Sequence, residues 1–187
     1  MRAALQSIQL FASFCSILGF GTTLSAQSPG DINHLAFRLI EKRDNGRLES
    51  LVFQGALAPN TKSKDGTTLL MYAALHGDAE GVRILLEAGA DPSASNDHGA
   101  NALIWGAADV EKVRLLVEHG AKVNVASKSG MTPLASAAAH VGGGESVTYL
   151  LQQGADHAVK VQGFLNLTPL GIACFHGNQE SVKALLD

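Results

Sequence analysis

Apolar residues along the chain gather into short amphipathic runs that return at nearly constant spacing. Within each run they stand three and four positions apart, which is the spacing of one face of an α-helix. A Gly-Ala pair follows the first three runs, and its glycines, Gly89, Gly120 and Gly154, are 31 and 34 residues apart. The runs are Val82–Leu86, Val113–Val117, Val147–Leu151 and Val182–Leu186. The pattern predicts one helix that is repeated along the chain.

A second pattern precedes each run and predicts a partner helix. It starts with Thr or Asn, reaches a Leu two residues later and continues into small residues. The Thr or Asn side chain can cap a helix, and a Pro next to it fits the first helical position, where no N–H is needed. Glycine in left-handed geometry can end each helix. The predicted caps are Thr68, Asn101, Thr132 and Thr168, and the predicted ends are Gly77 and Gly177 for this helix and Gly89, Gly120 and Gly154 for the next.

These motifs resemble ankyrin repeats, which carry Gly-x-Thr-Pro-Leu-His, an Ala-Ala core and Leu-Leu-x-x-Gly-Ala-Asp. Thr-Pro-Leu stands intact at 132–134 and 168–170, and the resemblance covers residues 31–187. It implies an all-α solenoid of stacked helix-turn-helix units with short β-turn fingers. The segment Leu103–Arg114 is similar to a form found in exported bacterial ankyrin-repeat proteins. The usual His is replaced by Met71, Ile104, Ala135 and Gly171, so we expect less rigid turns.

We expect three parts along the chain. Residues 1–26 resemble a secretory signal peptide, because one charge at Arg2 precedes an apolar stretch and small residues up to Ala26. An uncleaved membrane anchor is the alternative. Residues 27–63 are predicted to form an N-terminal capping helix pair, and residues 64–187 four repeats, the last incomplete. An incomplete last repeat exposes an apolar face, so either the chain is a fragment of a longer protein or another molecule covers that face.

The expected location is therefore outside the cytoplasm, periplasmic or secreted. Cleavage near Ala26 would remove the apolar stretch, so we expect no membrane attachment of the mature chain. It would also leave Cys174 as the one cysteine, which predicts no disulfide. Cys174 occupies the small-residue position of Ala74 and Ala138, so we expect a buried thiol. The formal net charge of −3 is spread along the chain without a basic tract, which argues against nucleic acid as a partner.

No catalytic residue, cofactor site or metal site is predicted. His76, His140 and His176 end equivalent helices, and neighbouring repeats of a solenoid are about 10 Å apart, too far for two such side chains to bind one zinc ion at about 2 Å. The run Gly142-Gly143-Gly144 lacks the Lys and Ser or Thr of a phosphate-binding loop, so it is interpreted as a flexible connector.

The family resemblance places partner contacts on the finger tips and on the exposed side of the first helix of each repeat, facing a groove. The candidate residues are Leu75, His76, His98, Met131, His140, Phe164, Leu165, Leu167, Phe175 and His176. The last finger is apolar at its tip, which favours a contact site, although packing within the protein is the alternative. The predicted function is non-catalytic protein–protein interaction; the alternative is an accessory domain of a longer enzyme or redox protein truncated at residue 187.

Overall fold

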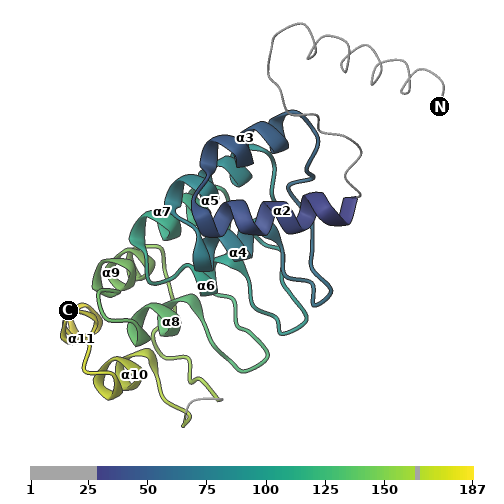
Figure 1. Cartoon of the computed structure of the whole chain (residues 1–187). Coiled ribbons are helices and arrows are strands. Elements are labelled where there is room, and N and C mark those ends of the chain that lie inside the picture. Colours follow the sequence, from purple (N-terminus) through teal and green to yellow (C-terminus); the bar gives the residue numbers. More distant parts are fainter. Residues whose placement is uncertain (1–28, 163–164) are drawn as a thin grey trace, which may run out of the picture. The chain divides into compact units, whose positions relative to one another are not determined.

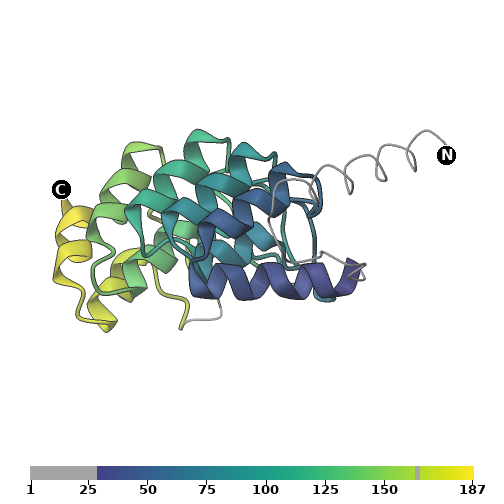
Figure 2. The same ribbon diagram turned by 45° about the horizontal axis from the view of Figure 1, so that its top comes forward.

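The computed structural model describes residues 29–162 and 165–187, and residues 32–187 form one compact unit. Helices follow one another in pairs and stack in two layers (Figures 1 and 2). The helices are α2 (Pro29–Lys42), α3 (Asn45–Phe53), α4 (Leu69–His76), α5 (Ala79–Glu87), α6 (Ala102–Trp105), α7 (Val110–Glu118), α8 (Pro133–Ala139), α9 (Gly144–Gln152), α10 (Pro169–Phe175) and α11 (Gln179–Leu186). The predicted all-α solenoid is confirmed.

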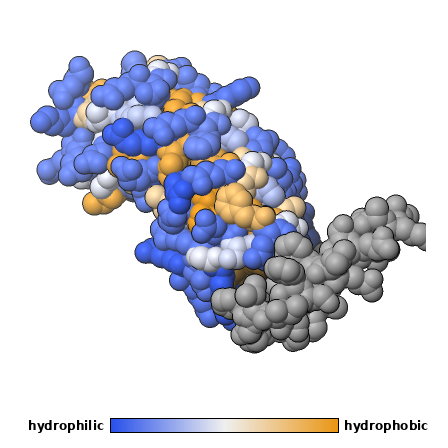
Figure 3. All heavy atoms as spheres, turned by 90° about the horizontal axis from the view of Figure 1, so that it is seen from above, coloured by the Kyte–Doolittle hydropathy of each residue, from blue (hydrophilic) through white to orange (hydrophobic). Residues whose placement is uncertain are grey.

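Each helix packs on its equivalent in the next repeat. The inner layer runs through α4, α6, α8 and α10, and the outer layer through α3, α5, α7, α9 and α11. Apolar residues fill the space between the layers, where Val82, Val113 and Val147 repeat one position of the outer helices and are fully buried. Their equivalent in the last repeat, Val182, is only half-buried. Seen from the side of the outer helices, apolar patches lie among hydrophilic residues (Figure 3).

The predicted helix caps are present. The side chains of Thr68, Asn101, Thr132 and Thr168 each accept a hydrogen bond from a backbone N–H three residues later, and prolines begin α8 and α10. Asp109 caps the start of α7. The connection from α6 is short, since only Ala107 and Ala108 separate Asp109 from Gly106, the C-cap of α6. These bonds satisfy N–H groups that a helix start leaves without a partner.

The prediction that Gly77 is left-handed is wrong. Gly177, Gly89, Gly120 and Gly154 have the expected positive φ, but Gly77 has φ −82° and an extended backbone. A Cβ on Gly77 would lie 2.9 Å from the Ala73 oxygen and 3.1 Å from Ile40 Cγ2. Close packing therefore requires glycine here, and the left-handed conformation does not.

The glycine run 142–144 joins α8 to α9, as expected. A Cβ on Gly142 would have nothing within 4 Å, whereas Gly143 and Gly144 are closely packed. A Cβ on Gly143 would lie 2.1 Å from the Ala137 oxygen, and one on Gly144 would lie 2.6 Å from Glu180 Cβ. These glycines let the turn approach α8 and the following repeat.

Four fingers connect the helix pairs and project from the inner layer (Figure 1). Neighbouring fingers are joined by backbone hydrogen bonds from Asp97 N to the Asp65 oxygen (3.0 Å) and from Lys128 N to the His98 oxygen (2.9 Å). In the last finger the positive-φ positions are Leu165 and Asn166, at 51° and 59°. Among the described residues, no helix has the length and hydrophobicity needed to cross a bilayer.

Candidate interaction surface

The inner surface is the face formed by α4, α6, α8, α10 and the fingers. It carries the described candidate contact residues at both of its ends and along its middle. His98 and His140 lie in the middle with exposed side chains, and the His140 Nδ1 donates to the Ser136 oxygen at 2.7 Å. Such a bond fixes the imidazole ring on the end of α8 and leaves Nε2 available to a partner.

At the C-terminal end, the apolar candidates differ in exposure. Leu165 is 76% exposed and Phe175 is 64% exposed, whereas Met131 and Leu167 are half-buried. Met131 and Leu167 pack on a small cluster around Val161. Internal packing therefore occupies part of these two side chains, which favours the packing alternative for them. Phe164 lies outside the described residues.

At the N-terminal end, Leu75 and His76 belong to a pocket with a volume of about 370 Å³. Leu75 is 47% exposed. The pocket lies between α2, the first finger, α4 and α6. Its lining residues are Phe37, Ser63, Asp65, Thr67, Tyr72, Leu75, His76 and Trp105.

Aromatic rings form much of this N-terminal pocket. Phe37 and Tyr72 meet edge to face with their centroids 4.8 Å apart, and the Tyr72 and His76 centroids are 4.5 Å apart. Trp105, from the next repeat, is half-buried. The two ring contacts orient Phe37, Tyr72 and His76, and Phe37, Tyr72 and Trp105 each remain partly exposed.

Two carboxylates accompany the rings. Hydrogen bonds from the Ser63 and Thr67 hydroxyl groups, with one from Thr67 N, hold the pKa of Asp65 at about 2, below its ordinary 3.8. The Tyr72 hydroxyl donates to Glu41, and this bond raises the pKa of Tyr72. The pocket therefore combines aromatic rings with the carboxylate of Asp65, which stays ionised at neutral pH.

Three pocket residues were not predicted from the sequence: Phe37, Tyr72 and Trp105. One signal was available, because Tyr72 and Trp105 each stand four residues after a helix cap, Thr68 and Asn101. Equal repeat positions on neighbouring inner helices lie side by side, so two aromatic residues there predict an aromatic surface. Phe37 lies on α2, which does not carry the repeat motifs, so no repeat position could predict its place beside Tyr72.

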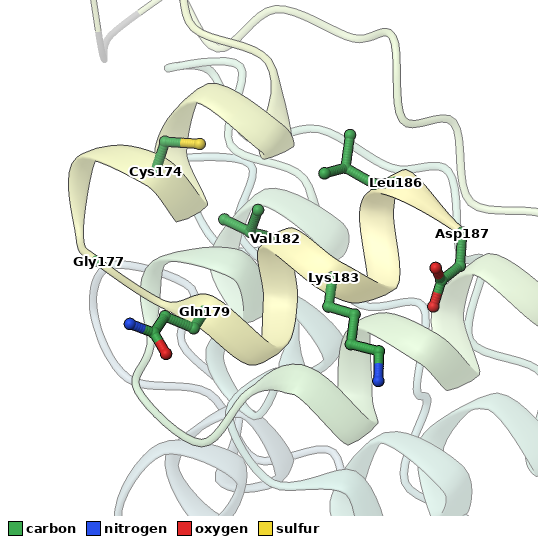
Figure 4. Close-up of a pocket in the computed structure, with 7 residues that line it drawn as sticks. All are labelled: Cys174, Gly177, Gln179, Val182, Lys183, Leu186 and Asp187. Atoms are coloured by element: carbon green, nitrogen blue, oxygen red, sulfur yellow. The ribbon is translucent and has the colours of Figure 1, made fainter.

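A second pocket, of about 540 Å³, lies against the last helix pair (Figure 4). Cys174 from α10 projects into it with Val182 and Leu186 from α11. The Cys174 thiol is exposed, so the prediction of a buried thiol is wrong. Ala74 and Ala138 are buried because the following repeat packs on them. Among the described residues, no following repeat packs on α10, which carries Cys174.

The histidines remain separate in the structure. His76, His140 and His176 stand at the ends of α4, α8 and α10, in different repeats. Across residues 29–162 and 165–187, no three His, Cys, Asp or Glu side chains are grouped so as to hold a metal ion.

Comparison with known proteins agrees with this architecture. The family model described as ankyrin repeats (3 copies) matches residues 34–127, 95–161 and 109–187. A search of curated proteins finds no match. The matched ranges together span the helix pairs from α2 to α11. The chain belongs to the ankyrin-repeat family, whose domains typically bind other proteins.

Proposed function

We propose that this protein is exported and binds another protein through its inner surface without chemistry of its own. The observation that carries the proposal is the family membership, together with exposed apolar side chains at both ends of that surface, Leu75 at one and Leu165 and Phe175 at the other. Exposed apolar residues within a polar rim are typical anchors of protein interfaces.

The residues at the C-terminal end support a contact role. Phe175 packs edge to face on His176 with centroids 5.4 Å apart, and His176 Nδ1 donates to the Ile172 oxygen at 3.0 Å. The ring of Phe175 is thereby oriented while most of its surface stays exposed. An ordered aromatic side chain loses less conformational entropy when a partner covers it.

Affinity capture tests the proposal. The mature chain is immobilised, incubated with the exported fraction of the source cells, and bound proteins are identified by mass spectrometry. We expect a specific partner whose recovery falls at least several-fold for Leu75→Ser or Phe175→Ser, because buried anchors contribute more than about 1 kcal/mol each. Phe53→Ser is the matched control, because Phe53 is 58% exposed but lies on outer helix α3.

Equal loss of the partner with Phe53→Ser, or no loss with either inner-surface variant, would contradict binding through this surface. The same cell fractions test export: the proposal requires the chain outside the cytoplasm, with a mature N-terminus near residue 27. Recovery of the chain only from the cytoplasm, starting at Met1, would refute that part.

A further inference from the structure

We propose that the N-terminal pocket binds an arginine side chain of the protein partner, a proposal that rests on the proposed protein-binding function. The pocket joins three aromatic residues, Phe37, Tyr72 and Trp105, with the carboxylate of Asp65. A guanidinium group can stack on an aromatic face and, in the same position, donate a charged hydrogen bond to a carboxylate oxygen.

The rings are arranged to attract a cation. Phe37 meets Tyr72 edge to face, which orients Tyr72, and the Tyr72 hydroxyl is bound to Glu41. A phenol that donates to a carboxylate carries more electron density in its ring, and this strengthens the attraction of the π-face for positive charge. The described structure already contains such a contact, since the Arg114 guanidinium carbon lies 4.7 Å from the centroid of Tyr149.

Asp65 is prepared as the anion of this site. Its Oδ2 accepts from Thr67 Oγ1 at 2.9 Å, its Oδ1 accepts from Thr67 N at 3.3 Å, and Ser63 Oγ also donates to Oδ1. These bonds fix the carboxylate and leave an acceptor position on Oδ2 for a ligand, because Oδ1 already accepts two donors and Oδ2 accepts one. Binding to a fixed carboxylate costs little ordering of the protein.

Among the residues that the structure describes, the combination occurs at one end of the inner surface only. The repeat positions that hold Tyr72 and Trp105 are Ser136 and Ile172 in the last two repeats. Ser136 is buried and donates to the Ile104 oxygen at 2.8 Å, and Ile172 belongs to an apolar cluster. An anionic side chain would be repelled by Asp65, and an aliphatic one would leave that carboxylate desolvated. Arginine satisfies both parts of the pocket.

The single tryptophan of the chain, Trp105, provides a direct reporter. The full chain is titrated with acetylated, amidated Gly-Gly-Arg-Gly-Gly and with matched peptides carrying Lys, Leu or Glu at the centre. Trp105 fluorescence and its indole N–H chemical shift are recorded. We expect a saturable change with the arginine peptide, a weaker one with lysine, and none with leucine or glutamate.

Variants locate the site. Tyr72→Leu should weaken binding of the arginine peptide about 3- to 30-fold, the range of a cation–π contact. Asp65→Asn should weaken it several-fold, because the guanidinium loses a charged acceptor. Tyr149→Leu, at the other tyrosine of the chain, is the control and should leave binding unchanged. Thermal melting checks that each variant is folded; if Tyr72→Leu does not fold, Asp65→Asn and the peptide selectivity still decide.

A leucine peptide that binds as tightly as the arginine peptide would overturn the proposal, as would unchanged binding by Asp65→Asn. The two proposals fail separately. If protein capture depends on Leu75 and Phe175 while the arginine peptide does not bind, the inner surface binds protein but the pocket is not an arginine site. If the peptide binds selectively while no protein is captured, the pocket assignment stands and the protein-binding function fails.

Discussion

Lys112, on α7, is buried between two repeats. Its ammonium group binds the C-terminal end of α4, the inner helix of the preceding repeat. Nζ donates to the Ala74 oxygen at 3.1 Å and to the Gly77 oxygen at 2.8 Å. Burial lowers the pKa of Lys112, and the carboxylate of Asp109, 3.9 Å away, opposes that shift. Cationic donors at a helix C-terminus satisfy carbonyl groups that the helix leaves without partners.

Replacing Lys112 with Met should destabilise the protein. The methionine fills a similar volume but leaves two buried carbonyl groups without their donor, which costs about 1–3 kcal/mol. Chemical denaturation measures the change in free energy of unfolding. Lys122→Met is the control, because Lys122 is exposed on the surface. An unfolding free energy that is unchanged or higher in Lys112→Met would show that removing the buried charge outweighs the lost hydrogen bonds.

The contact of Lys112 with the end of α4 could not be predicted from the sequence. The same repeat position is Gly81, Ser146 and Ser181 in the other repeats, so the pattern predicted no common role. Ser146 and Ser181 are buried, and their hydroxyl groups have no hydrogen-bond partner in the structure. The role of Lys112 depends on reach across the repeat interface, which a periodic pattern does not encode.

Among the elements, helices were predictable and fingers were less so. Caps and apolar spacing act within a few residues, so the caps Thr132 and Thr168 could be assigned from local sequence. Gly77 and Cys174 could not, because their conformation and exposure depend on the repeats before and after them. Finger geometry likewise depends on contacts with neighbouring fingers, such as the bond from Asp97 N to the Asp65 oxygen.

The first finger should lose stability in acid through Asp65. Its pKa is about 2 in the folded protein against an ordinary 3.8, so its stabilising contribution is complete above pH 3.8 and is lost as the pH falls through about 2. The difference in unfolding free energy between the wild type and Asp65→Asn should therefore shrink over that window. A difference that stays constant with pH would contradict the assigned hydrogen bonds.

The last finger offers a test that separates stability from binding. Leu165 adopts φ 51°, a conformation that costs an ordinary residue roughly 1 kcal/mol and costs glycine little. Leu165→Gly should keep or raise the melting temperature while it weakens capture of the partner. Asn166→Gly is the control at the other positive-φ position. Lower stability in Leu165→Gly would show that the side chain contributes to packing, and unchanged capture would exclude it as a contact.

Over the whole stack, stability should fall towards the last repeat. In interior repeats Val82 and Leu85 are fully buried, whereas their equivalents in α11, Val182 and Leu185, are half-buried. In a solenoid each repeat is stabilised mainly by its neighbours. Backbone amides of α11 should therefore exchange with solvent faster than those of α5 and α7. Equal protection of the three helices, measured by hydrogen exchange, would contradict this gradient.

Binding through the inner surface can be located by hydrogen exchange of the chain measured with and without its captured partner. We expect added protection in the first and last fingers and in α4 and α10, with α5, α7 and α9 unchanged. Protection confined to the outer helices, with the fingers exchanging as in the free chain, would contradict the claim.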